Sequence, residues 1–152
     1  MLKVGDKLPS FTLPDQNGAP FSVDTALGKG PLVFFFYPKD ETPVCTKEVC
    51  SFRDANAEFA AAGAAVFGVS SDDVASHKRF AEKHQLNYRL LADVGGKVRA
   101  QLGVPRAMFG LADGRVTYVV DQGGVVRLVH EATLQAQVHV DEALAVIRAL
   151  QK

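Results

Sequence analysis

The chain has 152 residues, of which 47% are hydrophobic and 22% charged, and its 17 basic residues balance its 17 acidic ones. This length and composition predict a single globular domain over residues 1–152. The balanced charge excludes the strongly basic surface of a nucleic-acid-binding protein. No apolar run is long enough to span a bilayer, and residues 1–6 have no apolar core of the signal-peptide type. We therefore expect a cytoplasmic protein with neither a nucleic acid nor a membrane as partner.

The first part of the chain predicts a hairpin and then a central strand. Short β-like segments over 11–13 and 21–23 flank Asn17-Gly18, which is a strong signal for a hairpin turn. Residues 31–37 form a continuous apolar run bounded by glycine and proline. A short run of this kind is typical of a strand buried on both faces, and its three consecutive phenylalanines are assigned to the core.

The rest of the chain alternates helices and strands. Apolar side chains recur at three- and four-residue steps from Thr46, which predicts a helix that ends at Gly63. The elements expected after it are a strand over 64–70, a helix ending near Gln85, a strand over 88–91, a weak helix over 94–102, an irregular segment over 104–114, a hairpin of strands over 115–121 and 125–130, and a closing helix that includes 138–150. This order predicts an α/β sandwich with a mixed central β-sheet flanked by helices.

Both cysteines lie in the segment Tyr37–Cys50, which joins the central strand to the first long helix. Cys45 falls where the first helical turn is expected, and the unpaired N–H groups and positive dipole end of a helix N-terminus favour a thiolate there. Two cysteines do not form a disulfide framework, and the spacing Cys45-x4-Cys50 is not a usual zinc-binding pattern. We interpret Cys45 as a nucleophile and expect no metal.

Pro38, Thr42 and Cys45 match the pattern Pro-x3-Thr-x2-Cys, and with this motif the chain resembles the peroxiredoxins. The second cysteine, Cys50, makes it similar to the bacterioferritin comigratory protein branch of that family, also called peroxiredoxin Q. Further matches over nearly the whole chain are Gly5-Asp6-x-x-Pro9-x-Phe11, Phe80–His84, Leu90–Asp93 and Arg115–Asp121. Val44 departs from the branch, which usually has glycine before the cysteine, and the departure affects the loop conformation and substrate entry rather than the chemistry.

The resemblance implies a thioredoxin-like fold and a peroxidase that reduces hydrogen peroxide and organic hydroperoxides with a thiol. It also implies that the enzyme needs no bound cofactor or metal. A dithiol donor, thioredoxin or a similar protein, would recycle it. Members of this branch are often monomers, so we expect a monomer.

The family pattern assigns a role to each site residue. Cys45 attacks the peroxide and becomes a sulfenic acid. Thr42, three residues upstream, accepts a hydrogen bond from the peroxide and donates one to the thiolate. Arg115 stabilises both the thiolate and the leaving oxygen, and Pro38 shields the sulfur from water. Glu48, in the first helical turn, is expected to orient the arginine.

Arg115 is chosen over Arg53 and Arg106 because the strand sequence that follows it matches the family. Without that match, an arginine at the start of a strand is more often a surface charge. Each of the four histidines is expected to be solvated or structural rather than catalytic.

Cys50 is implied as the resolving thiol, which forms a disulfide with Cys45. In a regular helix, residues five apart have Cα atoms separated by ~8–9 Å, whereas a disulfide usually requires less than ~7 Å. The two cysteines therefore cannot bond while the helix is intact. We predict that its first turns unwind during each catalytic cycle and expose the disulfide to the reductant.

Three alternative functions remain. A thioredoxin-type disulfide oxidoreductase would also use two cysteines, but Cys-x-x-Cys is missing. A non-catalytic binding module would keep both cysteines structural, with slow and unselective alkylation. A cysteine-ligated metal protein would contain stoichiometric metal.

Overall fold

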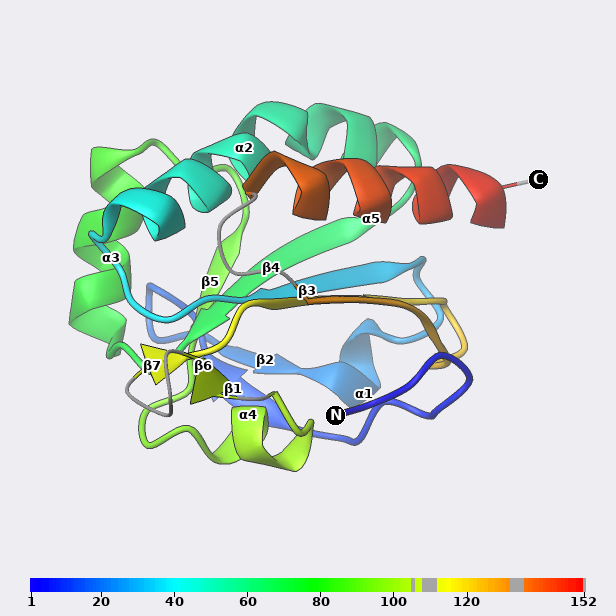
Figure 1. Ribbon diagram of the computed structural model, residues 1–152, viewed down its shortest axis with the longest axis horizontal. Coiled ribbons are helices and arrows are strands. Elements are labelled where there is room, and N and C mark those ends of the chain that lie inside the picture. Colours follow the sequence, from blue (N-terminus) through cyan, green and yellow to red (C-terminus); the bar gives the residue numbers. More distant parts are fainter. Residues whose placement is uncertain (105, 108–111, 132–135, 152) are drawn as a thin grey trace.

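The computed structural model describes residues 1–104, 106–107, 112–131 and 136–151. Its central sheet has five strands in the order β5-β4-β3-β8-β9, shown in Figure 1. β3 pairs in parallel with β4 and antiparallel with β8, which confirms the mixed sheet expected from the sequence. The strands are β3 (Leu32–Phe36), β4 (Ala65–Ser70), β5 (Arg89–Ala92), β8 (Val116–Val120) and β9 (Val126–Glu131).

The sheet separates two hydrophobic clusters, because successive side chains of β3 point to opposite faces. Val33 and Phe35 belong to one cluster, and Phe34 and Phe36 belong to the other. Every residue of β3 is buried, as expected for a central strand.

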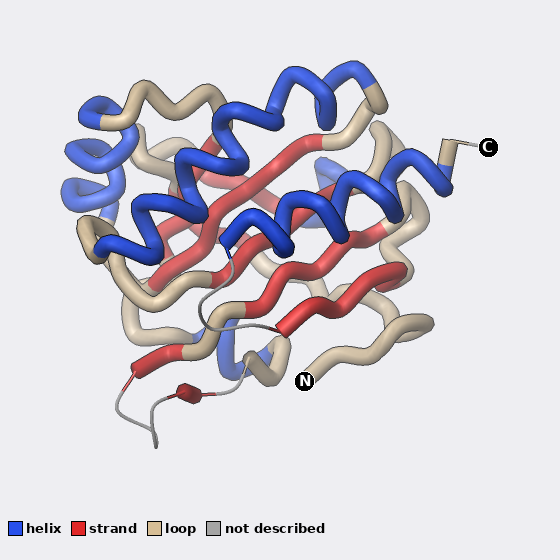
Figure 2. Tube along the Cα trace, turned by 45° about the horizontal axis from the view of Figure 1, so that its top comes forward, coloured by secondary structure: helices blue, strands red, loops and turns tan. Residues whose placement is uncertain are grey.

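Long helices cover the face of the sheet that carries Val33 and Phe35, and a hairpin with two short helices covers the opposite face (Figures 1 and 2). The long helices α2 (Pro43–Ala61) and α5 (Ala136–Leu150) lie side by side over the first face, and α3 (Val74–Lys83) packs against β5. The second face is covered by the hairpin of β1 (Thr12–Pro14) and β2 (Pro20–Ser22), together with α1 (Val23–Ala26) and α4 (Lys97–Gln101). The β1–β2 hairpin confirms the turn predicted at Asn17-Gly18.

The structure differs from the expected elements in three places. α2 begins at Pro43 rather than at Thr46, and proline suits the first helical position because its missing N–H would have no partner there. The weak helix expected over 94–102 shortens to α4, because Gly95 and Gly96 have positive φ values of 87° and 71°. The segment expected to be irregular includes β6 (Arg106–Ala107) and β7 (Ala112–Asp113), which pair antiparallel. Residues 105 and 108–111 of that segment lie outside the described residues.

Within the described part of the chain, no helix has the length and apolar character needed to cross a membrane.

Candidate active site

The strand pairing places Arg115 near the loop that carries the predicted nucleophile. β3 runs into this loop after Phe36, and its antiparallel neighbour β8 starts at Val116, which is paired with Phe36. Arg115 directly precedes β8, so it lies at the same end of the strands as the loop that follows β3. It is buried, with 8% of its surface exposed.

Cys45 is the third residue of α2 and is completely buried. The expected position in the first helical turn is therefore confirmed. Cys50 lies further along the same helix, is partly buried, and is a free thiol, as is Cys45. α2 is continuous through both positions.

Glu48 connects the helix to Arg115. It lies one helical turn after Cys45 and is fully buried, and its Oε1 is 3.2 Å from Nη1 of Arg115. This ion pair confirms the expected contact between Glu48 and the arginine. Burial raises the pKa of Glu48 from 4.5 to about 7, although the charge of Arg115 and its hydrogen bond act in the opposite direction.

A histidine that the sequence did not single out completes this group. His139 of α5 is fully buried, and its Nδ1 lies 2.7 Å from Oγ1 of Thr117 and 3.6 Å from Oε2 of Glu48. The buried carboxylate is thus flanked by Arg115 on one oxygen and by His139 on the other. Elements from three parts of the chain, α2, β8 and α5, hold this polar group beneath the first turns of α2.

Thr42 is the N-cap residue of α2, but its side chain makes no capping hydrogen bond. Its hydroxyl donates to the carbonyl oxygen of Lys39 at 3.0 Å. This differs from the expected donation to the sulfur, because the single hydroxyl hydrogen is already used. The oxygen lone pairs of Thr42 can still accept a hydrogen bond from a peroxide. Pro38 is partly buried at the start of the same loop.

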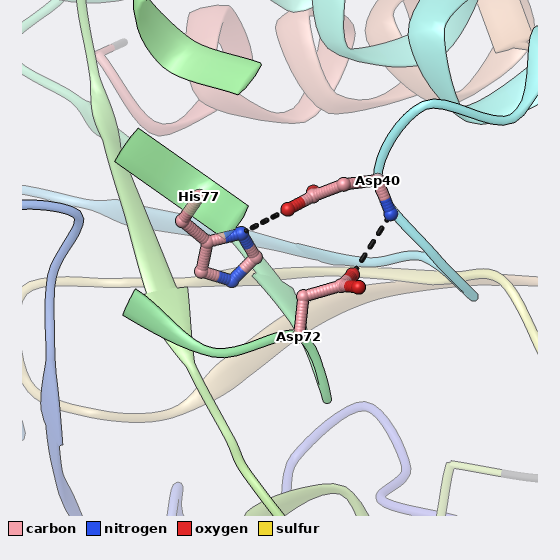
Figure 3. Close-up of side chains that lie close together, drawn as sticks. All are labelled: Asp40, Asp72 and His77. Carbon is pink, nitrogen blue, oxygen red and sulfur yellow. Dashed lines mark hydrogen bonds and ion pairs between the residues drawn. The ribbon is translucent and has the colours of Figure 1, made fainter. Parts of the chain in front are cut away.

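Asp40 anchors the middle of this loop through its side chain. The carboxylate is buried and accepts hydrogen bonds from the Tyr37 hydroxyl at 2.6 Å and the Ser76 hydroxyl at 2.9 Å. Its Oδ2 also lies 2.7 Å from Nδ1 of His77, as Figure 3 shows. The other ring nitrogen of His77 faces the carbonyl oxygen of Leu91 at 3.0 Å. A carbonyl can only accept, so the hydrogen bond to Leu91 is donated by Nε2, and Nδ1 faces the Asp40 carboxylate.

The backbone of Asp40 is also held. Its N–H donates to Oδ2 of Asp72 at 2.8 Å, and that oxygen also accepts from the Ser70 hydroxyl at 2.6 Å. Asp40, Asp72 and His77 form the one group of potential metal ligands among residues 1–104, 106–107, 112–131 and 136–151. Their ligand atoms make the hydrogen bonds described here, so the group is accounted for as a network that anchors the loop. The sequence analysis missed this network because its members are far apart in the chain: Asp40 meets Asp72, which follows β4, and residues of α3.

Comparison with known proteins agrees with this geometry. Residues 4–129 match the model of the AhpC/TSA family. The chain is 52% identical over 145 residues to the chloroplastic peroxiredoxin Q of Arabidopsis thaliana, which covers 95% of this chain and 67% of the plant protein. The expected cytoplasmic location is therefore corrected, because the names of several curated plant relatives place them in the chloroplast.

Two solved structures share the fold over almost the whole chain. The peroxidoxin BcpB of Mycobacterium tuberculosis has a TM-score of 0.92 and 42% identity, with all of both chains covered. The bacterioferritin comigratory protein of Xanthomonas campestris has a TM-score of 0.85 and 31% identity, with 93% of this chain and 92% of that chain covered. The mixed sheet with helices on both faces is thus the thioredoxin-like fold of these proteins. The chain belongs to the AhpC/TSA family, as a peroxiredoxin of the peroxiredoxin Q branch, an enzyme that reduces peroxides through a thiol.

Proposed function

We propose that Cys45 is the thiol with which this peroxiredoxin reduces hydroperoxides. The observation that supports this role most directly is its position, buried in the first turn of α2 and one turn from the Arg115–Glu48 ion pair. The thiolate attacks one peroxide oxygen and the O–O bond breaks. Cys45 becomes a sulfenic acid, and the other oxygen leaves with a proton as water or an alcohol.

Arg115, Thr42 and Pro38 assist this step. The buried guanidinium of Arg115 supplies positive charge near the thiolate and the leaving oxygen, in a setting where water screens it little. Thr42 orients the peroxide by accepting its O–H, since the threonine hydrogen is held by Lys39. Pro38 has no N–H and limits the access of water at the start of the loop. The substrates include organic hydroperoxides, in line with the alkyl peroxide reduction activity named for the Xanthomonas protein.

Cys50 is the resolving thiol in this proposal. After α2 unwinds at its start, the Cys50 thiolate attacks the sulfur of the sulfenic acid, water leaves, and a Cys45–Cys50 disulfide forms. A dithiol donor of the thioredoxin type then reduces the disulfide. Residues 1–152 act as one catalytic domain and as a monomer, without a nucleic acid or membrane partner.

The test compares wild type, Cys45→Ser and Cys50→Ser in a single reaction with hydrogen peroxide. The chain has no tryptophan, so sulfenic acid is trapped chemically and counted by mass spectrometry at each quench time. Cys45→Ser should form none, whereas Cys50→Ser should form it at the wild-type rate but accumulate it without a disulfide. Unchanged peroxide consumption by Cys45→Ser would contradict the proposal. Insulin reduction, assayed in parallel, should be absent and distinguishes a disulfide oxidoreductase.

A further inference from the structure

We propose that Asp40 and His77 are positioning residues. In this proposal they form a latch that fixes the loop in front of α2, and so sets the balance between reaction of Cys45 with peroxide and its disulfide bond with Cys50. The inference rests on the proposed roles of the two cysteines. It concerns how readily the first turns of α2 unwind, a property that those roles leave open.

The latch holds the loop to parts of the protein that do not unwind. The Asp40 carboxylate contacts Tyr37 at the end of β3, and Ser76 and His77 on α3. His77 is itself fixed to β5 through the Leu91 carbonyl. None of these partners belongs to α2, so the latch can remain closed on one side of the unwinding segment and limit how far that segment opens.

The chain directly after the latch is poorly stabilised by itself. Glu41 has a φ of +69°, a left-handed conformation that is unfavourable for a residue with a side chain. Thr42 is the N-cap of α2 but provides no side-chain cap, and an absent cap weakens the first helical turn. The side chain of Glu41 is half exposed and pairs with Lys83 at 3.0 Å and with His84 at 3.9 Å, and contacts of this kind contribute little. The buried contacts of Asp40 therefore restrain the chain directly before this end of the helix, in addition to the Arg115–Glu48 ion pair within its first turns.

The latch should be visible in the fate of the sulfenic acid. On Cys45 this group has two competing outcomes. It can condense with the Cys50 thiol, which releases water and forms the disulfide. Alternatively it can be oxidised by a second peroxide, which gives sulfinic acid and water. The first outcome requires unwinding and the second does not, so their ratio reports how tightly the latch holds.

Two variants loosen the latch from opposite sides. Asp40→Ala removes the carboxylate, and His77→Gln removes the contact with Asp40 but keeps a donor for the Leu91 carbonyl. Both should raise, by roughly tenfold, the peroxide concentration at which half of Cys45 becomes sulfinic acid, because the loss of a buried hydrogen bond lets α2 unwind and the disulfide form more readily. Both should speed amide hydrogen exchange over residues 43–50 of the reduced protein by a similar factor.

Conservative and unrelated variants provide the controls. Asp40→Asn should stay close to wild type, because its amide can donate to Nδ1 of a neutral His77 that still donates to Leu91. Asp15→Ala is the matched control: Asp15 is also buried, but it holds the β1–β2 turn through Asn17 and Ala19. It should lower stability without changing either readout.

The latch is refuted if Asp40→Ala and His77→Gln match Asp15→Ala in both the sulfinic acid threshold and the exchange of residues 43–50. If Asp40→Ala does not fold, the comparison of His77→Gln with Asp15→Ala decides the question in the same way. Failure of the proposed function gives a different result, namely no sulfenic acid on Cys45 in the wild type. The exchange measurement needs no peroxide and still tests the latch.

Discussion

The Nη1 atom of Arg115 lies 3.2 Å from Oε1 of Glu48, and this buried ion pair sits one helical turn from Cys45. An ionised Glu48 therefore partly neutralises the guanidinium that is proposed to assist Cys45. The opposite oxygen of Glu48 faces His139 at 3.6 Å. The charge available to the substrate therefore depends on the protonation of Glu48, because its negative form offsets that of Arg115.

The pH dependence of stability should reveal Glu48. Burial raises its pKa to about 7 in the folded protein, from 4.5 for an unperturbed carboxyl. Between these two pH values, the folded state keeps a proton on Glu48 that the unfolded state has released. The contribution of this proton to stability is complete below about pH 4.5 and is lost as the pH rises through about 7. Relative to Glu48→Gln, which does not titrate, the wild type should lose on the order of 3 kcal/mol of unfolding free energy over this range.

Urea unfolding of both proteins at several pH values from about 4.5 to about 8 measures this difference. Glu58→Gln is the control, because Glu58 is an exposed glutamate of the same helix, paired with Arg148 at the surface. Its difference from wild type should change little with pH. If the difference in unfolding free energy between wild type and Glu48→Gln does not vary with pH, Glu48 is ionised over the whole range. The effect of Arg115 on its pKa then outweighs the effect of burial.

Substitution of Arg115 should slow the first oxidation more than it affects folding. Arg115→Lys keeps the charge but loses the two-pronged donor that can contact Glu48 and the peroxide together. The rate of sulfenic acid formation should fall by roughly 10- to 100-fold. Arg127→Lys is the control, because Arg127 is an exposed arginine of the neighbouring strand that pairs with Asp121. Equal rates for both variants would remove Arg115 from the reaction.

The hydroxyl of Thr42 is expected to act as an acceptor for the peroxide. Thr42→Val removes it at nearly constant volume, whereas Thr42→Ser retains it. Sulfenic acid formation should slow by roughly tenfold or more in the first variant and remain near wild type in the second. Thr25→Val is a matched control, since the Thr25 hydroxyl donates to the carbonyl of Ser22 in the same local pattern. If Thr25→Val slows the reaction as much as Thr42→Val, the effect is one of stability.

Local features of the fold were predictable from the sequence. The apolar run that became β3 and the Asn17-Gly18 hairpin are determined by neighbouring residues, and both were found where they were expected. Cys45 was placed in the first turn of α2 for the same reason, although the helix begins at Pro43, where proline needs no N–H partner. Arg115 was identified by the strand that follows it, and the pairing of β8 with β3 explains its position.

The polar groups that hold the site could not be predicted in this way. His77 reaches Asp40 because the loop that follows β3 meets α3, and His139 reaches Glu48 because α5 lies over the same face of the sheet as α2. Hydrophobic periodicity predicts which face of a helix is buried, but it does not predict which distant side chain that face will meet. The sequence predicts only that the histidines are solvated or structural rather than catalytic, and the partners of His77 and His139 become visible only in the structure.

Val44 offers the most direct test of the predicted unwinding. It is the second residue of α2 and is partly buried, at a position where the branch usually has glycine. Helix propensity falls from alanine through valine to glycine, over a range of about 1 kcal/mol. If the first turn must open before Cys50 can reach Cys45, the rate of disulfide formation should follow the order Val44→Gly, wild type, Val44→Ala, over about a fivefold range. The rate is measured by quenching single reactions and counting free thiols.

The rate of the preceding oxidation provides the internal control for this series. Sulfenic acid formation should vary less than disulfide formation, because it occurs with the helix intact. The same order should appear in the amide exchange of residues 43–50 before any peroxide is added, since both readouts depend on one unwinding equilibrium. Disulfide formation that is independent of residue 44, with exchange that follows the expected order, would mean that the first turn opens but does not limit the approach of Cys50.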